Sequence, residues 1–297
     1  MTSGPLSPEI SVVIPTYNRA AMLVEAVQSV LAQETTDFEL IVVDDGSTDE
    51  TERKLARFGP HLRYIRQEHA GVSAARNRGL EFCRASLVAF LDSDDLWLPG
   101  KLRIQQKYFA EHPEVYICQT EEIWWRNGRR VNPKKRHRKP SGDIFRRSLD
   151  LCLVSPSAVM VRRELFERVG YFDEGLPIAE DYDFWLRVAV DYPVPLIPEA
   201  LVIKRGGRLD QLSATPGIER YRIGSLEKLL NSGRLSPGQD EWTRQALQHK
   251  CKIYGEGCIK RGRVEEGEAY VALPEVYTRR VCPGETSERG EKGAVFR

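Results

Sequence analysis

The stretch Leu87-Val88-Ala89-Phe90-Leu91-Asp92-Ser93-Asp94-Asp95 passes directly from apolar residues to carboxylates. An uninterrupted apolar run of this length is typical of a β-strand that is covered on both faces. Three carboxylates within four residues repel one another unless an exposed turn or a cation relieves the repulsion. The stretch therefore predicts a buried strand that ends in an acidic turn.

The sequence before this strand alternates short β-branched runs with longer amphipathic runs, which indicates a parallel sheet flanked by helices. Together with residues 87–91, the pattern gives four consecutive βα units and predicts the α/β class with a mostly parallel sheet. Ligands collect at the carboxyl ends of the strands in such sheets. The other predicted strands are Ile10–Ile14, Glu39–Val43 and Leu62–Gln67, and the helices after them are Ala20–Gln33, Ser47–Phe58 and Ser73–Arg84.

The rest of the chain carries a second α/β portion and then turns helical. The second portion has a predicted strand at Ser157–Val161, a helix at Arg163–Val169 and a helix that opens at Glu180-Asp181. We also expect a C-terminal helical appendage and, at residues 283–297, a polar, glycine-rich disordered tail. The helices of the appendage are predicted at Ile218–Asn231, Gln239–Lys260 and Glu265–Val276.

Net charge and hydropathy narrow the classes of partner. The 297 residues carry a formal charge of +1, whereas a dedicated nucleic-acid binder usually has a clear basic excess. No stretch approaches the roughly 20 apolar residues that a membrane-spanning helix needs. Residues 1–5 also lack the basic and apolar regions of a signal peptide. We therefore expect no nucleic-acid partner and a cytoplasmic location.

Polar side chains follow the predicted strands at the edge where ligands collect. Tyr17, after the first strand, is suited to stack on a base, and Asp45, after the second, can accept hydrogen bonds from a base or a ribose. Arg76, near the start of the third helix, can face a phosphate or the acidic turn. Each has a structural alternative: a packed ring, a turn residue and a solvated helix charge, respectively.

The acidic turn itself indicates a metal site. Carboxylate oxygens suit Mg²⁺ or Mn²⁺, and such ions usually bridge one or two carboxylates to the phosphates of a ligand. The alternative is an acidic turn or helix cap without a ligand, because short acidic motifs are common. The candidates for nucleotide contacts at the same predicted edge favour a metal–diphosphate site.

Five motifs follow one another along the chain: Ser11-Val12-Val13-Ile14-Pro15-Thr16-Tyr17-Asn18-Arg19, Ile41-Val42-Val43-Asp44-Asp45-Gly46-Ser47-Thr48-Asp49, Gly71-Val72-Ser73-Ala74-Ala75-Arg76-Asn77, Phe90-Leu91-Asp92-Ser93-Asp94-Asp95 and Glu180-Asp181-Tyr182-Asp183. In this order they resemble the motifs of the family-2 inverting glycosyltransferases, which have the GT-A fold, and the resemblance spans residues 9–212. It implies a GT-A type nucleotide-sugar-binding sheet and an Mn²⁺ or Mg²⁺ cofactor. It also implies inverting transfer of a sugar from a nucleotide-sugar donor, with a UDP-sugar favoured, to a hydroxyl of a glycan or lipid-linked acceptor.

The resemblance also implies roles for single positions. Asp181 would be the general base that deprotonates the acceptor hydroxyl, and Asp94 would be the metal ligand of a DxD pair with Asp92. A structural alternative is that Glu180 and Asp181 only cap their helix. The nucleotide-binding residues would be Pro15, Tyr17, Arg19, Asp45, Arg76 and Asp92, and the candidates for acceptor or diphosphate contacts are Glu180, Trp185, Arg205 and Arg208.

Residues 204–213 depart from the family pattern. Many relatives have a histidine in this segment that can complete the metal site, but this chain has no histidine between residues 138 and 248. Arg205 or Arg208 would then contact the diphosphate, and water would fill the coordination shell. The sequence supports the metal site from the acidic turn alone and leaves the third ligand open.

The predicted layout places a GT-A domain at residues 1–212, with a nucleotide-binding part at 9–112 and an acceptor part at 113–212. The helical region follows at 213–282. The sequence does not determine the oligomeric state.

Residues 126–139 hold eight Lys or Arg and no acid, and Pro133 and Pro140 disfavour helix and strand, so we expect an exposed loop. This segment could engage anionic lipid, an acidic acceptor or a lipid-diphosphate carrier. It or the C-terminal helices would then give peripheral contact with the inner face of a membrane. A solvated loop without a partner is the alternative.

Two other functions use similar parts. A nucleotidyltransferase would be expected to have a glycine-rich loop and a basic residue after the first strand, where this chain has Pro15-Thr16-Tyr17-Asn18-Arg19. A non-catalytic nucleotide-sugar-binding module would lack the acid at the position of the base, and Asp181 is present. The sequence therefore favours a glycosyltransferase.

Overall fold

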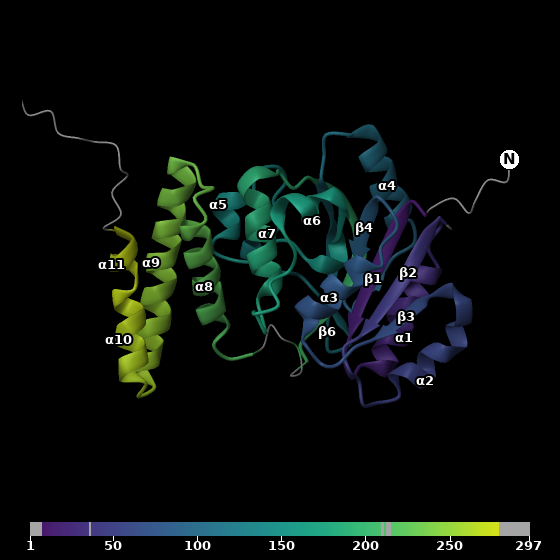
Figure 1. Cartoon of the computed structure of the whole chain (residues 1–297), viewed down its shortest axis with the longest axis horizontal. Helices are drawn as coiled ribbons and strands as arrows, with labels where there is room; N and C mark the ends of the chain where they lie inside the picture. Colours follow the sequence, from purple (N-terminus) through teal and green to yellow (C-terminus); the bar gives the residue numbers. More distant parts are fainter. Residues whose placement is uncertain (1–7, 36, 209–210, 212–214, 279–297) are drawn as a thin grey trace, which may run out of the picture. The chain divides into compact units, whose positions relative to one another are not determined.

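The computed structural model describes residues 8–35, 37–208, 211 and 215–278 (Figure 1). The chain divides into two compact units, Met1–Thr243 and Arg244–Arg297. The predicted tail at 283–297 and most residues around the predicted boundary at 212 lie outside the described residues. Helix α8 (Ile218–Asn231) belongs to the first unit and packs against α7 (Glu180–Asp191), so the division falls later in the chain than position 212.

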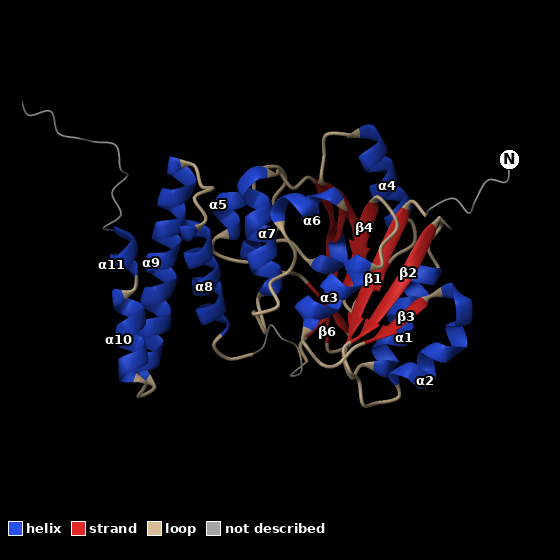
Figure 2. Ribbon diagram, viewed as in Figure 1, coloured by secondary structure: helices blue, strands red, loops and turns tan. Residues whose placement is uncertain are grey.

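The strands of the described residues form a nine-stranded sheet, which Figure 2 shows in red. Its order is β3-β2-β1-β4-β8-β6-β9-β5, with β7 paired to β6. The strands are β1 (Ile10–Thr16), β2 (Phe38–Asp44), β3 (Arg63–Arg66), β4 (Leu87–Phe90), β5 (Leu96–Trp97), β6 (Ile117–Arg126), β7 (Arg129–Val131), β8 (Val159–Arg162) and β9 (Leu196–Gly206). The other helices of the first unit are α1 (Ala20–Leu31), α2 (Thr51–Leu55), α3 (Val72–Glu81), α4 (Lys101–Glu111), α5 (Phe145–Ser148) and α6 (Glu164–Val169).

Four neighbouring strands, β3, β2, β1 and β4, are parallel, which confirms the predicted run of βα units. Successive side chains of β1 point to opposite faces: Val12 and Ile14 pack in a core with residues of α1 and α4, whereas Val13 faces Gly79 of α3. A Cβ added at Gly79 would lie 2.4 Å from Val13 Cγ1, so glycine allows α3 to approach the sheet closely. Both faces of these strands are covered, so their polar residues gather at the carboxyl-terminal edge.

The second half of the sheet mixes strand directions. β8 is antiparallel to both β4 and β6, β9 is parallel to β6, and β5 is antiparallel to β9. The register between β6 and β9 shifts between Thr120 and Glu122, an irregularity that bends a strand locally. Parallel pairing therefore dominates only in the first half of the sheet.

The basic segment 126–139 is more ordered than a loop. Arg129–Val131 forms β7, which pairs with β6 through a turn at Asn127-Gly128, where both residues have a positive φ. Asn-Gly is the favoured pair for a two-residue hairpin turn of this kind. The prediction of an exposed loop throughout was therefore wrong: the hairpin signal outweighs the nearby Pro133, and Lys139 at the end of the segment is buried.

The second unit is helical, as predicted, and consists of most of α9 (Pro237–Lys260), α10 (Val264–Ala272) and α11 (Pro274–Thr278). A Cβ added at Gly255 would lie 2.6 Å from the carbonyl oxygen of Gly267, so α9 and α10 are in close contact there. Among the helices of the described residues, none has both the length and the apolar character needed to cross a bilayer.

Candidate active site

The acidic turn after β4 directs its three carboxylates to different partners. Asp92 Oδ1 lies 2.8 Å from Arg76 Nη2, and the Asp92 side chain is 29% exposed. Asp94 Oδ2 lies 2.7 Å from Arg19 Nη1, and its side chain is 9% exposed. Asp95 is buried. Of the three carboxylates, Asp92 is thus partly exposed, whereas Asp94 and Asp95 are buried.

Asp95 joins the turn to the second half of the sheet. Its Oδ2 accepts a hydrogen bond of 2.7 Å from Ser157 Oγ, and its Oδ1 accepts one of 2.9 Å from the backbone N–H of Arg205. Burial raises the pKa of Asp95 well above its ordinary value, and the neighbouring Asp94 and Asp92 raise it further. We infer that Asp95 is structural and holds positions 92 and 94 in place.

Arg76 joins the acidic turn to helix α7. Its Nη2 donates to Asp92, and its Nη1 donates to Glu180 Oε1 at 2.7 Å. Burial disfavours the charge of Arg76, but Asp92 and Glu180 outweigh burial and raise the pKa of the guanidinium. The sequence predicted that this arginine faces the acidic turn or a phosphate, and the structure places it against the turn.

Glu180 and Asp181 form the first turn of α7, as predicted. The preceding residue, Ala179, has a φ of 63°, a left-handed conformation that is costly for a residue other than glycine and starts the helix abruptly. Glu180 is 5% exposed, and burial raises its pKa, although Arg76 opposes this change. Asp181 is partly exposed, and its Oδ1 accepts a 2.7 Å hydrogen bond from the backbone N–H of Tyr182. The predicted base is therefore the accessible carboxylate of this pair.

The predicted base pocket contains a residue that the sequence did not single out. The ring of Tyr17 stacks on that of His69, with the centroids 4.1 Å apart and an interplanar angle of 22°. His69 Nδ1 lies 2.8 Å from Asp45 Oδ2. Asp45 also accepts hydrogen bonds from the backbone N–H groups of Ala70 and Gly71, at 2.9 and 2.8 Å. Asp45 thus fixes the loop after β3, and its contact with a base stays a prediction, as does that of Tyr17.

The loop after β1 is held by the loop after β2. Asn18, with a φ of 50°, accepts a hydrogen bond of 2.8 Å at Oδ1 from the backbone N–H of Thr48, and its own N–H donates to Ser47 Oγ at 2.8 Å. Asp49 Oδ2 accepts from the backbone N–H of Ala20 at the start of α1. Pro15 is buried within β1, and its role in the base pocket stays a prediction.

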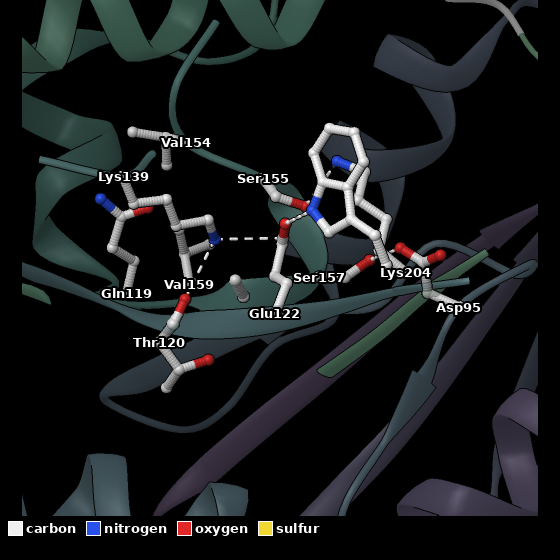
Figure 3. Close-up of polar contacts among 12 residues, drawn as sticks. Asp95, Gln119, Thr120, Glu122, Lys139, Val154, Ser155, Ser157, Val159 and Lys204 are labelled. Atoms are coloured by element: carbon white, nitrogen blue, oxygen red, sulfur yellow. Dashed lines mark hydrogen bonds and ion pairs between the residues drawn. The ribbon is translucent and has the colours of Figure 1, made fainter. Parts of the chain in front are cut away.

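A buried network of charges lies beside the acidic turn (Figure 3). Lys139 Nζ is 3.0 Å from Glu122 Oε1 and donates to the Thr120 carbonyl at 3.0 Å. Lys204 Nζ donates to Ser155 Oγ at 3.1 Å. Burial lowers the pKa of Lys204, but the charges of Glu122, Asp95, Asp92 and Asp181 outweigh it and raise the pKa overall. The Lys204 ammonium therefore stays charged next to the predicted catalytic carboxylates.

Sequence patterns did not identify this network. Glu122 and Lys204 come from paired strands, and the strand β6 had not been predicted. The signal that could have indicated Lys204 is its position directly before Arg205, in the segment 204–213 that departs from the expected family pattern.

Two candidate contacts from the sequence have structural partners. Trp185 is 2% exposed and packs against Phe172 and Phe184 in an aromatic cluster, and its contact with an acceptor stays a prediction. Arg205 donates from Nε to the Asp94 carbonyl and pairs through Nη1 with Glu25.

The remaining candidates lie close by. The backbone N–H of Arg208 lies 3.4 Å from Gln211 Oε1, and Gln211 Nε2 lies 3.3 Å from Asp94 Oδ2. A diphosphate contact by Arg205 or Arg208 stays a prediction.

The acidic turn fits a divalent cation that is shared with a ligand. Asp92 is partly exposed and Asp94 is buried, and each is balanced by an arginine. Within the described part of the chain, no three His, Cys, Asp or Glu side chains converge as a complete metal cage. Mg²⁺ and Mn²⁺ are often held by one or two carboxylates while phosphate oxygens and water complete the shell. The residues present therefore fit such an ion, and Asp94 as its direct ligand stays a prediction.

Comparisons with known proteins agree with this geometry. The model of glycosyl transferase family 2 matches residues 11–170. Escherichia coli WfgD, named a UDP-Glc:alpha-D-GlcNAc-diphosphoundecaprenol beta-1,3-glucosyltransferase, is 29% identical over 193 residues, which are 63% of this chain and 72% of that protein. The chain spans only 27% to 60% of the length of matched Rickettsia proteins, which are named as uncharacterized glycosyltransferases.

Two solved structures show the same fold at low sequence identity. Staphylococcus aureus TarS 1-349 in complex with UDP-GlcNAc superposes with a TM-score of 0.71 and 21% identity, over 90% of this chain and 79% of that one. The mannosyltransferase PcManGT from Pyrobaculum calidifontis, in complex with GDP-Man and Mn²⁺, gives 0.61 and 19%, over 91% and 76% of the two chains. This chain therefore has the GT-A fold and belongs to glycosyl transferase family 2.

Proposed function

We propose that this protein is an inverting glycosyltransferase that moves a sugar from a nucleotide-sugar donor, with UDP as the favoured nucleotide, to a hydroxyl of a glycan or lipid-linked acceptor. The observation that carries the proposal is the Arg76 bridge between Asp92 and Glu180. This bridge holds the start of α7, with Asp181, against the acidic turn. One accessible carboxylate thus lies beside a turn that fits a metal–diphosphate group.

The proposed reaction assigns one task to each side of this bridge. Asp181 accepts the proton of the acceptor hydroxyl as its oxygen attacks the anomeric carbon. The bond from that carbon to the diphosphate breaks on the opposite face, so the configuration inverts. Arg76 is a positioning residue, because both of its terminal nitrogens bind protein carboxylates. A Mn²⁺ or Mg²⁺ ion at Asp94 would neutralise the charge of the leaving diphosphate.

The relatives support a nucleotide-sugar donor, but they differ in its nucleotide base. TarS was solved with UDP-GlcNAc, WfgD is named for UDP-Glc, and PcManGT was solved with GDP-Man. The Tyr17–His69 stack offers an aromatic surface for either base. The lipid-linked acceptor in the name of WfgD supports the acceptor class proposed for this chain. A cytoplasmic location with peripheral membrane contact stays a prediction.

The test is a thermal-shift panel of UDP, GDP, CDP and dTDP, each with Mn²⁺, Mg²⁺ or EDTA. A ligand that binds only the folded protein raises the Tm. We expect one nucleotide to raise the Tm in the presence of metal and not with EDTA, and we expect Asp94→Ala to abolish that shift. An equal nucleotide shift in wild type and Asp94→Ala would contradict the assigned metal site.

The role of Asp181 as general base is tested separately, with turnover measured as nucleotide release in a panel of acceptors. Asp181→Asn should keep the metal-dependent shift and lower turnover by at least about 100-fold, the usual contribution of a general base. Asp191→Asn, at the exposed end of the same helix, is the control and should leave turnover unchanged. Full turnover in Asp181→Asn would refute the assignment of Asp181 as the general base.

A further inference from the structure

A pocket of about 320 Å³ opens where the basic segment folds back over β6. Its lining includes the buried ion pair of Glu122 and Lys139 and the partly exposed Trp124. The indole N–H of Trp124 donates to Glu122 Oε2 at 3.2 Å, which fixes the ring. The remaining lining residues are Glu121, Pro133, Lys134, Lys135, His137 and Arg138.

The pocket lies next to the proposed active site. Trp124 of β6 stands opposite Lys204 of β9, so their side chains share one face of the sheet. Strand β9 in turn lies between β6 and β5, and β5 begins directly after Asp95. Two strand spacings make about 10 Å, which is close to the length of a disaccharide. A group bound in the pocket would therefore lie on the same face of the sheet as Lys204, whose ammonium interacts electrostatically with Asp92, Asp95 and Asp181.

The charge of the pocket is positive. Lys134, Lys135 and Arg138 line it, and within the described residues none of the three forms an ion pair with a carboxylate. Lys139 is neutralised by Glu122, which leaves Glu121 as the remaining acid of the lining. Clustered Lys and Arg with free hydrogen-bond donors bind phosphate oxygens well.

We propose that this pocket is the acceptor subsite of the enzyme and that it takes an acceptor sugar carrying a phosphate group. The sugar packs against Trp124, and Lys134, Lys135 and Arg138 bind the phosphate. A pocket that combines an aromatic wall with a few charged groups orients such a ligand. The role of the bound sugar as an acceptor rests on the proposed glycosyl transfer. Binding of the sugar phosphate in the pocket does not require a donor.

The first experiment measures binding to the full chain by calorimetry, with glucose 6-phosphate, glucose and inorganic phosphate as probes. Because the pocket would hold both parts of glucose 6-phosphate at once, we expect this probe to bind at least about tenfold tighter than either part alone. Equal binding of glucose 6-phosphate and inorganic phosphate would overturn the proposal, because it would mean simple anion attraction.

Two double variants locate the site. Lys134→Gln/Lys135→Gln removes charges that line the pocket and should weaken glucose 6-phosphate binding at least about tenfold, the loss expected for two charge-assisted contacts. Arg129→Gln/Arg130→Gln removes two charges of the same segment that do not line the pocket, and it should change binding less than about twofold. Equal losses in the two variants would refute the subsite.

A membrane surface is the competing partner for the basic segment. If a membrane surface were the partner, wild type should bind vesicles of phosphatidylglycerol. The two double variants should then bind these vesicles more weakly than wild type, and by the same factor. That result, together with no binding of glucose 6-phosphate, would overturn the proposal. The thermal shift by nucleotide and metal is measured on the same samples: its persistence would show that only the acceptor assignment had failed, and its loss in every sample would identify a failure of the proposed function itself.

Discussion

In the half of the sheet formed by β3, β2, β1 and β4, the Asp45 carboxylate accepts two main-chain hydrogen bonds besides its contacts with Gln67 and His69, whereas in the half formed by β8, β6, β9 and β5 the Glu122 carboxylate is held by buried charges. Asp45 accepts from Ala70 and Gly71, whereas Glu122 faces Lys139 and the charge of Lys204. Main-chain donors are present whatever the side chains are. A buried charge needs each of its partners, because an unpaired buried ion is costly. The stability of the second half should therefore be more sensitive to single charge substitutions and to low pH.

The largest effect is expected where the two halves meet. Arg76→Leu leaves the buried Glu180 and the neighbouring Asp92 without their counter-charge and should lower the free energy of unfolding by about 3–5 kcal/mol. Urea denaturation measures the change. Arg78→Leu, on the same helix but exposed and paired with Glu81, is the matched control and should cost less than about 1 kcal/mol. Equal costs would mean that the bridge adds no more than a surface pair.

The second prediction concerns the stabilisation by Glu122 and its loss at low pH. Lys139 and Lys204 outweigh the burial of Glu122 and lower its pKa from 4.5 to about 2. Because the folded-state pKa is lowered, the stabilisation is complete above pH 4.5 and is lost as the pH falls toward 2. At neutral pH, Glu122→Gln should lower the free energy of unfolding by about 3 kcal/mol, because a tenfold change in proton affinity corresponds to about 1.4 kcal/mol.

Urea denaturation of wild type and Glu122→Gln between pH 7 and pH 3 tests this prediction. The difference in stability should shrink once the pH falls below 4.5. Glu111→Gln, at an exposed pair with Lys107, provides the baseline. A difference that stays constant across the whole range would show that the cost comes from packing and not from the charge.

The smallest loss of stability is expected in the first half of the sheet, where the substitution changes packing and not charge. Gly79→Ala puts a Cβ 2.4 Å from Val13 Cγ1 and should lower stability by about 1–3 kcal/mol, the usual cost of overpacking. The loss should be independent of pH, and Val13→Ala should partly restore stability in the double variant.

Gly224→Ala is the matched helical control. Its added Cβ meets no described atom within 4 Å, so the better helix propensity of alanine should raise stability by up to about 1 kcal/mol. Thermal unfolding of both variants measures the contrast. A stabilised Gly79→Ala protein would show that α3 can move away from β1 at little cost.

Patterns between neighbours in the sequence predicted much of the first half. The run from Leu87 to Asp95 predicted both the buried strand and the acidic turn, because apolar continuity and charge repulsion are local properties. The same logic placed Glu180 and Asp181 at a helix start. It failed for residues 126–139, where the prediction rested on two prolines and the density of charge and did not use the Asn127-Gly128 hairpin signal.

The sequence by itself determined the βα units, the acidic turn and the helical C-terminal region, since each follows from periodicity or turn chemistry within a few residues. Only the tertiary structure decided which distant side chains meet. Arg76 and Glu180 are 104 positions apart, and Lys204 reaches Ser155 across 49 positions. These contacts depend on the order of the strands, which places β9 between β6 and β5, and strand order is set by packing of the whole sheet rather than by any single segment.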